Sequence, residues 1–228
     1  MTYPNAAKGV KKIYKGEKYG LVASILVIIL GILVIALYVA GDGDPAANAN
    51  STTATIGVAV IVISIVIAAL IIVEAILTFL GLKDAAKDDE TFKTAYYLSI
   101  ASLVISIIAS LVSNVSSTEG SLLSSFATSF SSVVSAVLVL YVIQGITTLS
   151  GKLNNTEMAD NGKSVFTIVA VAKIGSAAIN LIVHMVEAGE TVTTVLGIAE
   201  LAMGILSIVG YFAYLKYLKK ATAMLEQN

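Results

Sequence analysis

The residues with the clearest potential for chemistry are charged side chains inside long apolar runs. Lys173 and Glu200 each lie near the middle of such a run, and Glu74 lies inside an earlier one. A charge near the centre of a bilayer costs about 2.5–3.5 kcal/mol on insertion scales, so it is expected to face a bundle interior and to be paired or functional. If these runs cross a membrane, two carboxylates and one ammonium leave one carboxylate over. That carboxylate could be protonated, could hold a cation, or could alternate between the two states.

A polar stripe extends from Lys173 along its run. At 100° per residue, Lys173, Asn180, His184 and Glu187 fall on one face of a helix. We expect His184 and Glu187 to form the outer mouth of this stripe. One imidazole beside one carboxylate supplies too few ligands for zinc, which takes three or four, so we expect neither a metal site nor a cofactor.

The other charged residues lie at similar depths in their runs. The chain turns between the last two runs near residue 188, and antiparallel geometry then puts Glu200 about level with Ser176, within reach of Lys173. A Lys173–Glu200 ion pair is therefore predicted, with Glu74 as the alternative partner. The predicted intramembrane polar cluster comprises Glu74, Gln144, Lys173, Asn180 and Glu200. The alternative is that these groups only fix helix packing.

The composition indicates that a lipid bilayer surrounds these runs. The chain is 57% hydrophobic and 13% charged, with a mean hydropathy of +0.91, whereas about a quarter of the residues in soluble domains are charged. The sequence contains no cysteine, which excludes disulfides and thiolate chemistry. A formal net charge of −1 without clustered cations among aromatics argues against a nucleic-acid partner.

Six apolar runs are long enough to cross a bilayer as helices. They cover about Tyr19–Ala40, Thr53–Leu82, Thr94–Ser113, Leu122–Ser150, Ser164–Val186 and Thr191–Leu215. The first run could belong to a signal peptide, but it exceeds the 7–15 residues of such apolar segments, which favours a retained helix. The sequence predicts an all-α integral membrane protein with six transmembrane helices.

The links between the runs alternate in charge. The first, third and fifth links hold no lysine, whereas the other links and both ends of the chain hold every lysine except Lys173. Because loop lysines stay on the cytoplasmic side, both termini are predicted to be cytoplasmic in a multi-pass cell-membrane protein. All links are short, so residues 1–228 are expected to form a single membrane domain without a soluble domain.

A weak internal repeat accompanies the charge pattern. Four residue pairs share an offset of 70: Lys93/Lys163, Glu74/Gln144, Thr78/Thr148 and Gly81/Gly151. They divide the chain into three tandem helical hairpins, at 15–82, 93–151 and 163–218.

These features favour two functions over catalysis. The first is a small permease or channel-like protein that moves protons, a cation or a small polar solute past the charged residues. The alternative is a non-catalytic membrane module that oligomerises, binds lipid or stabilises a partner. An enzyme is not expected, because no set of acid, base and nucleophile is recognisable. The expected partners are the lipid bilayer and either a second copy of the chain or another membrane protein.

Overall fold

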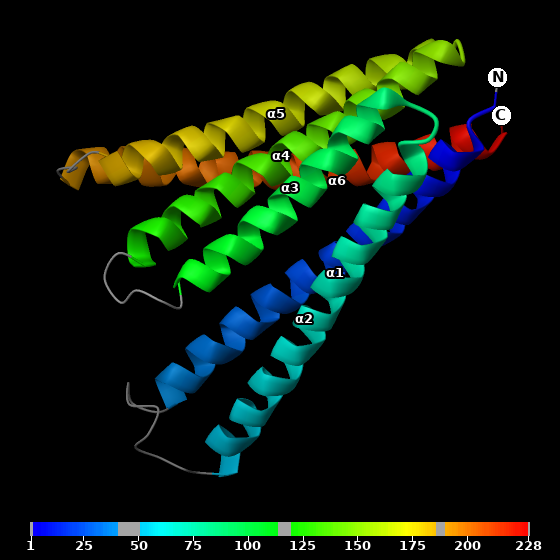
Figure 1. Ribbon diagram of the computed structural model, residues 1–228. Helices are drawn as coiled ribbons and strands as arrows, with labels where there is room; N and C mark the ends of the chain where they lie inside the picture. The colour runs from blue at the N-terminus through cyan, green and yellow to red at the C-terminus, as the bar shows by residue number, and fades with distance from the viewer. Residues whose placement is uncertain (1, 41–50, 114–119, 186–189, 228) are drawn as a thin grey trace. The chain divides into compact units, whose positions relative to one another are not determined.

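The computed structural model describes residues 2–40, 51–113, 120–185 and 190–227. These residues form six α-helices: α1 (Pro4–Ala40), α2 (Ser51–Ala85), α3 (Glu90–Ser113), α4 (Gly120–Lys152), α5 (Thr156–Met185) and α6 (Glu190–Gln227) (Figure 1). Within the described residues, every helix except α3 contains a stretch long and apolar enough to span a membrane. The predicted helical membrane protein is confirmed at this level, and the sixth span and the hairpin arrangement stay predictions.

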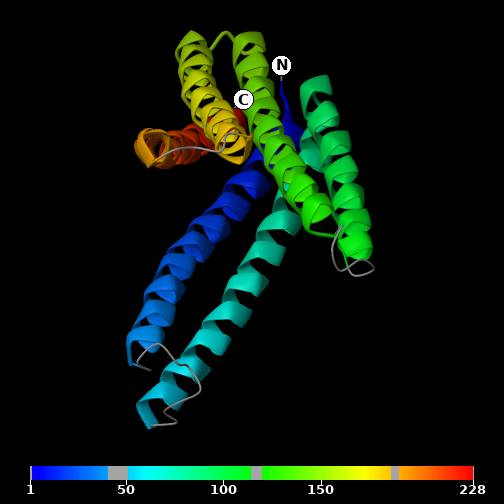
Figure 2. The ribbon, with the colours of Figure 1, turned by 90° about the vertical axis from the view of Figure 1, so that its left-hand side faces the viewer.

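The chain divides into two compact units. Residues 12–80 form one unit, in which α1 and α2 lie side by side (Figure 2). Residues 1–11 and 81–228 form the other, in which α3 packs on α4, α4 on α5 and α5 on α6. We call these the α1–α2 unit and the four-helix unit. The prediction of a single membrane domain is not tested by this division.

Two helices extend well beyond the predicted apolar runs. The first run was expected to begin at Tyr19 and the last to end at Leu215, but α1 begins at Pro4 and α6 ends at Gln227. Both extensions carry most of their lysines on exposed positions and mainly small or apolar residues on buried ones, apart from Glu17 and Thr222, so they are amphipathic helices. A helix predicted from averaged hydropathy ends where the first lysines lower the average, so the prediction misses such extensions.

The buried core of the four-helix unit is concentrated at the end that carries both chain termini. We call this region the hub, and it comprises residues 2–11, 81–95, 142–165 and 210–227. Its fully buried side chains include Val10, Leu82, Phe92, Ile146 and Leu218. The remaining parts of α5 and α6, residues 166–185 and 190–209, are called the arm. In the arm, Ile174, Leu201 and Ile205 are each at least 64% exposed.

The link between α4 and α5 is built from two asparagines. Asn154 has a φ of 55°, in the left-handed region, and it ends α4. Its N–H donates to Gly151 O at 3.0 Å, and the N–H of Asn155 donates to Ser150 O at 2.9 Å, the hydrogen-bond pattern of a Schellman motif. Asn155 Oδ1 then accepts the N–H of Met158 at 3.0 Å and caps α5. Three residues thus reverse the chain with the helix ends hydrogen-bonded.

The helix ends do not follow the offset of 70. The last residues of α2 and α4 are Ala85 and Lys152, 67 apart, and the first residues of α3 and α5 are Glu90 and Thr156, 66 apart. The offset of 70 therefore places its matched pairs about one helical turn out of register with the links. The internal repeat has no support from the helix boundaries and stays a prediction.

Candidate functional site

The charged residues of the arm are exposed. Lys173 on α5 and Glu200 on α6 both present their side chains at the surface of the four-helix unit. Among the residues that the structure describes, neither forms an ion pair with a group of opposite charge. The predicted burial of Lys173 and its pairing with Glu200 inside the α5–α6 hairpin are therefore not observed.

The packing of α5 on α6 sets the levels of the two residues along the helix axes. A Cβ added at Gly175 would lie 2.6 Å from Met203 Cε, so Gly175 and Met203 are level. Lys173, two residues before Gly175, is then level with Ile205, and Glu200, three residues before Met203, is level with Ala178. The five residues between levels 173 and 178 correspond to an axial separation of about 8 Å. Sequence reasoning had placed Glu200 at Ser176, about 3 Å closer.

Glu74 lies in the other unit, against α1. The carboxylate of Glu74 rests over Gly20, where an added Cβ would lie 2.7 Å from Oε2. One turn away, Gly16 faces Thr78 Oγ1 and the backbone oxygen of Glu74. Glu74 is half-buried, and no ion pair to it is formed by the described residues. Gly20 thus makes room for the carboxylate, and Gly16 for the backbone of α2, within the α1–α2 hairpin.

The remaining predicted site residues are either exposed or undescribed. Gln144 on α4 is exposed, unlike its offset partner Glu74. The side chains of Asn180 and His184, and the whole of Glu187, lie outside the described residues. Membership of all five residues in one polar cluster, and the outer mouth at His184 and Glu187, therefore stay predictions.

The hub holds an ion pair between a buried carboxylate and a partly exposed lysine, which the sequence did not single out. Asp89 precedes α3, its side chain is 4% exposed, and its Oδ2 accepts a hydrogen bond from Lys152 Nζ at 2.8 Å. Its Oδ1 accepts the N–H of Thr91 at 2.9 Å, which caps α3. Burial by itself raises the pKa of Asp89, but the hydrogen bonds from Lys152 and Thr91 outweigh it and hold the pKa below its ordinary value. The pair ties the start of α3 to the end of α4.

The neighbouring carboxylate, Asp88, caps the first helix. Its Oδ2 accepts the N–H of Ala6 at 2.7 Å, and its Oδ1 accepts a hydrogen bond from Asn5 Nδ2 at 2.9 Å. A carboxylate at a helix N-terminus also interacts favourably with the helix dipole. Asp88 and Asp89 therefore join the α2–α3 link to both α1 and α4.

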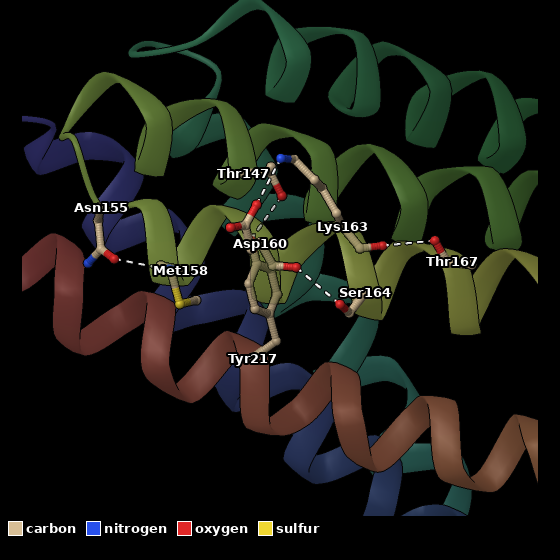
Figure 3. A network of polar contacts seen from close by, with 8 residues as sticks. All are labelled: Thr147, Asn155, Met158, Asp160, Lys163, Ser164, Thr167 and Tyr217. Carbon is tan, nitrogen blue, oxygen red and sulfur yellow. Dashed lines mark hydrogen bonds and ion pairs between the residues drawn. The ribbon is translucent and has the colours of Figure 1, made fainter.

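A second cluster joins α4, α5 and α6. Thr147 Oγ1 of α4 and the hydroxyl of Tyr217 from α6 lie 3.0 Å apart in a hydrogen bond (Figure 3). Gly162 of α5 lies against both oxygens, with no room for a side chain. Close by, Lys163 Nζ binds Asp160 Oδ1 at 2.8 Å. Among the described residues, no buried side-chain nitrogen or oxygen lacks a hydrogen-bond partner, so the buried polar side chains of the hub are satisfied.

A sequence signal existed for part of the hub. Asp89 stands directly before a helical run, as N-cap residues do, and Asn154-Asn155 stands between two runs where a left-handed residue and a cap are needed. The contacts of Lys152 and Tyr217 had no local signal, because they depend on which helices pack together.

The described residues contain no group of three or more histidine, aspartate or glutamate side chains arranged to hold a metal ion. The hub groups are engaged in caps and ion pairs, and the arm charges face outward. Comparison with protein-family models, with curated proteins and with solved structures finds no match to this chain.

Proposed function

We propose that the protein is a non-catalytic membrane module that assembles with copies of itself through the arm of α5 and α6. The observation that carries this proposal is the exposure of Lys173 and Glu200 within segments apolar enough to span a membrane. Each charge would cost about 2.5–3.5 kcal/mol if it faced lipid at mid-depth. A second protein surface that supplies the opposite charge removes this cost.

A second copy fits this requirement because Lys173 and Glu200 carry charges of opposite sign. In a two-fold dimer the same patch is used by both copies, so Lys173 of one copy meets Glu200 of the other, and this pairing occurs twice. The axial separation of about 8 Å between their levels lies within the combined reach of the two long side chains. Exposed apolar residues around them, such as Ile174 and Leu201, would pack in the same interface.

The surface of α6 also permits close approach of a neighbouring helix. Gly197 and Gly204 flank Glu200 in the sequence, and a Cβ added at either would meet nothing within 4 Å. Small residues on membrane helices favour association because they allow backbones to pack closely. This open face supports assembly through α6.

The experiment is a measurement of protein mass in detergent by light scattering. We expect the wild-type protein to be a dimer and Lys173→Met and Glu200→Gln to be mainly monomeric, because each leaves one charge unpaired. Ile208→Ala, an exposed apolar change on α6, is the control for general loss of apolar surface. A monomeric wild-type protein, or charge variants with the wild-type mass, would contradict the proposal.

A small permease is the second candidate, and Glu74 favours it. Glu74 is an ionisable group within a membrane-spanning helix, half-buried beside Gly20 and without an ion pair among the described residues. Intramembrane carboxylates of this kind serve as proton or cation sites in transporters. Flux of protons and alkali cations into proteoliposomes tests this candidate. A flux that Glu74→Gln abolishes, without a change in the mass of the protein complex, would favour transport. Absence of flux in the wild-type protein would exclude the permease.

We further propose that both termini face the cytoplasm, as the lysine pattern indicates. Single cysteines at Asp44, Asn114 and Glu190 should then react with an impermeant reagent added to intact cells. Cysteines at Lys87 and Glu157 should react only after lysis. The reverse pattern would invert the topology.

A further inference from the structure

A cleft lies where the two ends of the chain meet in the four-helix unit. The start of α1 and the end of α6 lie together there (Figure 1), joined by an ion pair of 2.7 Å between Lys11 Nζ and Glu226 Oε1. Between them is a cavity of about 480 Å³, a size within the usual range for small-molecule sites. None of the groups that line it belongs to the assembly surface on the arm.

The lining of the cleft combines apolar and charged residues. Pro4, Ala7 and Leu225 supply the apolar part. Lys8 and Lys11, one helical turn apart on α1, supply two ammonium groups, and Glu226 adds a carboxylate. A ligand that fits this lining has an anionic group next to an apolar part.

The two lysines keep donors for such a ligand. Lys8 Nζ lies 3.9 Å from Asp84 Oδ2, which is too long for a hydrogen bond, and the side chain of Lys8 is 66% exposed. Lys11 is 51% exposed and uses one of its three N–H donors on Glu226. Two neighbouring ammonium groups with free donors suit the several acceptor oxygens of a phosphate.

The helix N-terminus does not compete for this anion. Asp88 already accepts the N–H of Ala6, and the N–H of Ala7 is bonded to Tyr3 O at 3.0 Å. An incoming phosphate would therefore be held by the lysines and not by the backbone of α1.

We propose that this cleft binds the phosphate group of an anionic phospholipid. It lies on the lysine-bearing extensions of two helices that carry membrane-spanning stretches, and basic pockets beside such stretches bind lipid head groups. The apolar residues of the lining would contact the head-group carbons next to the phosphate. A free phosphate shares the same chemistry, and the test separates the two sources.

The test measures thermal protection of the purified protein in neutral detergent. Phosphatidylglycerol, phosphatidylcholine and inorganic phosphate are titrated separately, and the half-saturating concentration is read from the shift of the unfolding midpoint. We compare the wild type with Lys8→Gln/Lys11→Gln. The matched control is Lys163→Gln/Lys220→Gln, which removes the same charge from the same end of the molecule at lysines paired with Asp160 and Glu157.

The expected result is protection by phosphatidylglycerol alone, with a half-saturating concentration at least tenfold higher in Lys8→Gln/Lys11→Gln and within twofold of wild type in the control. Glu226→Gln removes the carboxylate that competes for Lys11 and should lower this concentration, which keeps the proposal testable if the double variant fails to fold. An equal rise of the half-saturating concentration in both double variants would contradict binding in the cleft. Equal protection by phosphatidylcholine would contradict recognition of the negative charge. Equal protection by inorganic phosphate would overturn the lipid as the source.

Discussion

The hub and the arm share helices α5 and α6 in one unit, yet they differ in how they bury apolar and charged side chains. In the hub, apolar side chains such as Phe92 and Leu218 are fully buried and charges such as Asp89 have partners. In the arm, Leu201 is 70% exposed and Lys173 forms no ion pair among the described residues. The hydrophobic effect needs water, and lipid tails are as apolar as the side chains that face them.

This difference indicates which part of the unit is adapted to which solvent. Part of the hub core lies on the amphipathic extensions of α1 and α6, where exposed apolar surface would be costly in water. The arm needs no core of its own in lipid, so its exposed isoleucines and leucines require no further explanation. Lys173 and Glu200 do require one, and they are the basis of the proposed assembly.

The largest loss of stability is expected from adding a side chain at Gly162, where α4, α5 and α6 pack closely in the hub. Gly162→Val places a side chain against Thr147 Oγ1 and the Tyr217 hydroxyl and should lower the free energy of unfolding by about 3 kcal/mol. Gly31→Val is the control, because an added Cβ there meets nothing within 4 Å. Unfolding of both variants by SDS in mixed micelles gives the values. Equal effects would show that the hub is not tightly packed.

A smaller loss of stability is expected from breaking the ion pair between Lys152 and Asp89. Lys152→Met leaves Asp89 without its charged partner and should cost about 2 kcal/mol at pH 7, as for other hydrogen bonds to charged groups. Lys220→Met breaks an exposed pair with Glu157 at 3.7 Å and should cost less than about 1 kcal/mol. A Lys152 variant as stable as the Lys220 variant would contradict the role given to the pair.

The same pair predicts a pH dependence with a definite sign. Because the pKa of Asp89 is lowered in the folded state, its stabilisation is fully present above the unfolded pKa, about 3.9, and is lost as pH falls through the lower folded pKa. The difference in stability between wild type and Lys152→Met should therefore be constant near neutral pH and shrink below about pH 4. A difference that grows in acid would contradict this assignment.

The smallest of these effects concerns the α4–α5 link. Asn154→Ala puts alanine in a left-handed conformation and should cost about 1 kcal/mol. Asn154→Gly should be neutral or slightly stabilising, because glycine adopts this conformation without strain. The SDS unfolding assay again measures both. Equal stability of the alanine and glycine variants would show that the link does not constrain the hub.

Much of the helical layout could be predicted from hydropathy alone. The ends of α1 at Ala40 and of α3 at Ser113 coincide with the predicted ends of their runs, because apolar residues stop there. Other helix ends were predicted less well. The start of α1 was predicted 15 residues too late, at Tyr19 and not at Pro4, and the end of α6 was predicted too early, at Leu215 and not at Gln227. There the helices continue through lysines, and only the spacing of buried Ala6, Val10 and their counterparts on α6 marks the continuation.

The site was less predictable, for a physical reason. Sequence periodicity identifies which residues share a helix face, but the level of one helix against another is set by contacts such as Gly175 with Met203. A shift of two residues there puts Glu200 level with Ala178 and not with the expected Ser176. The partner of an exposed charge is not encoded near it in the sequence, so that part of the site depends on what packs against the arm.

The measurement that tests the assembly most directly is complementation between two differently tagged variants. In Lys173→Glu positions 173 and 200 are both negative, and in Glu200→Lys both positions are positive. Neither variant should therefore pair with itself. Mixed dimers place a glutamate opposite a lysine at every contact, and purification through one tag should therefore recover the other variant in about equal amount. Charge pairing within one chain cannot produce this result. Recovery of each variant with itself, or of neither with the other, would contradict assembly through Lys173 and Glu200.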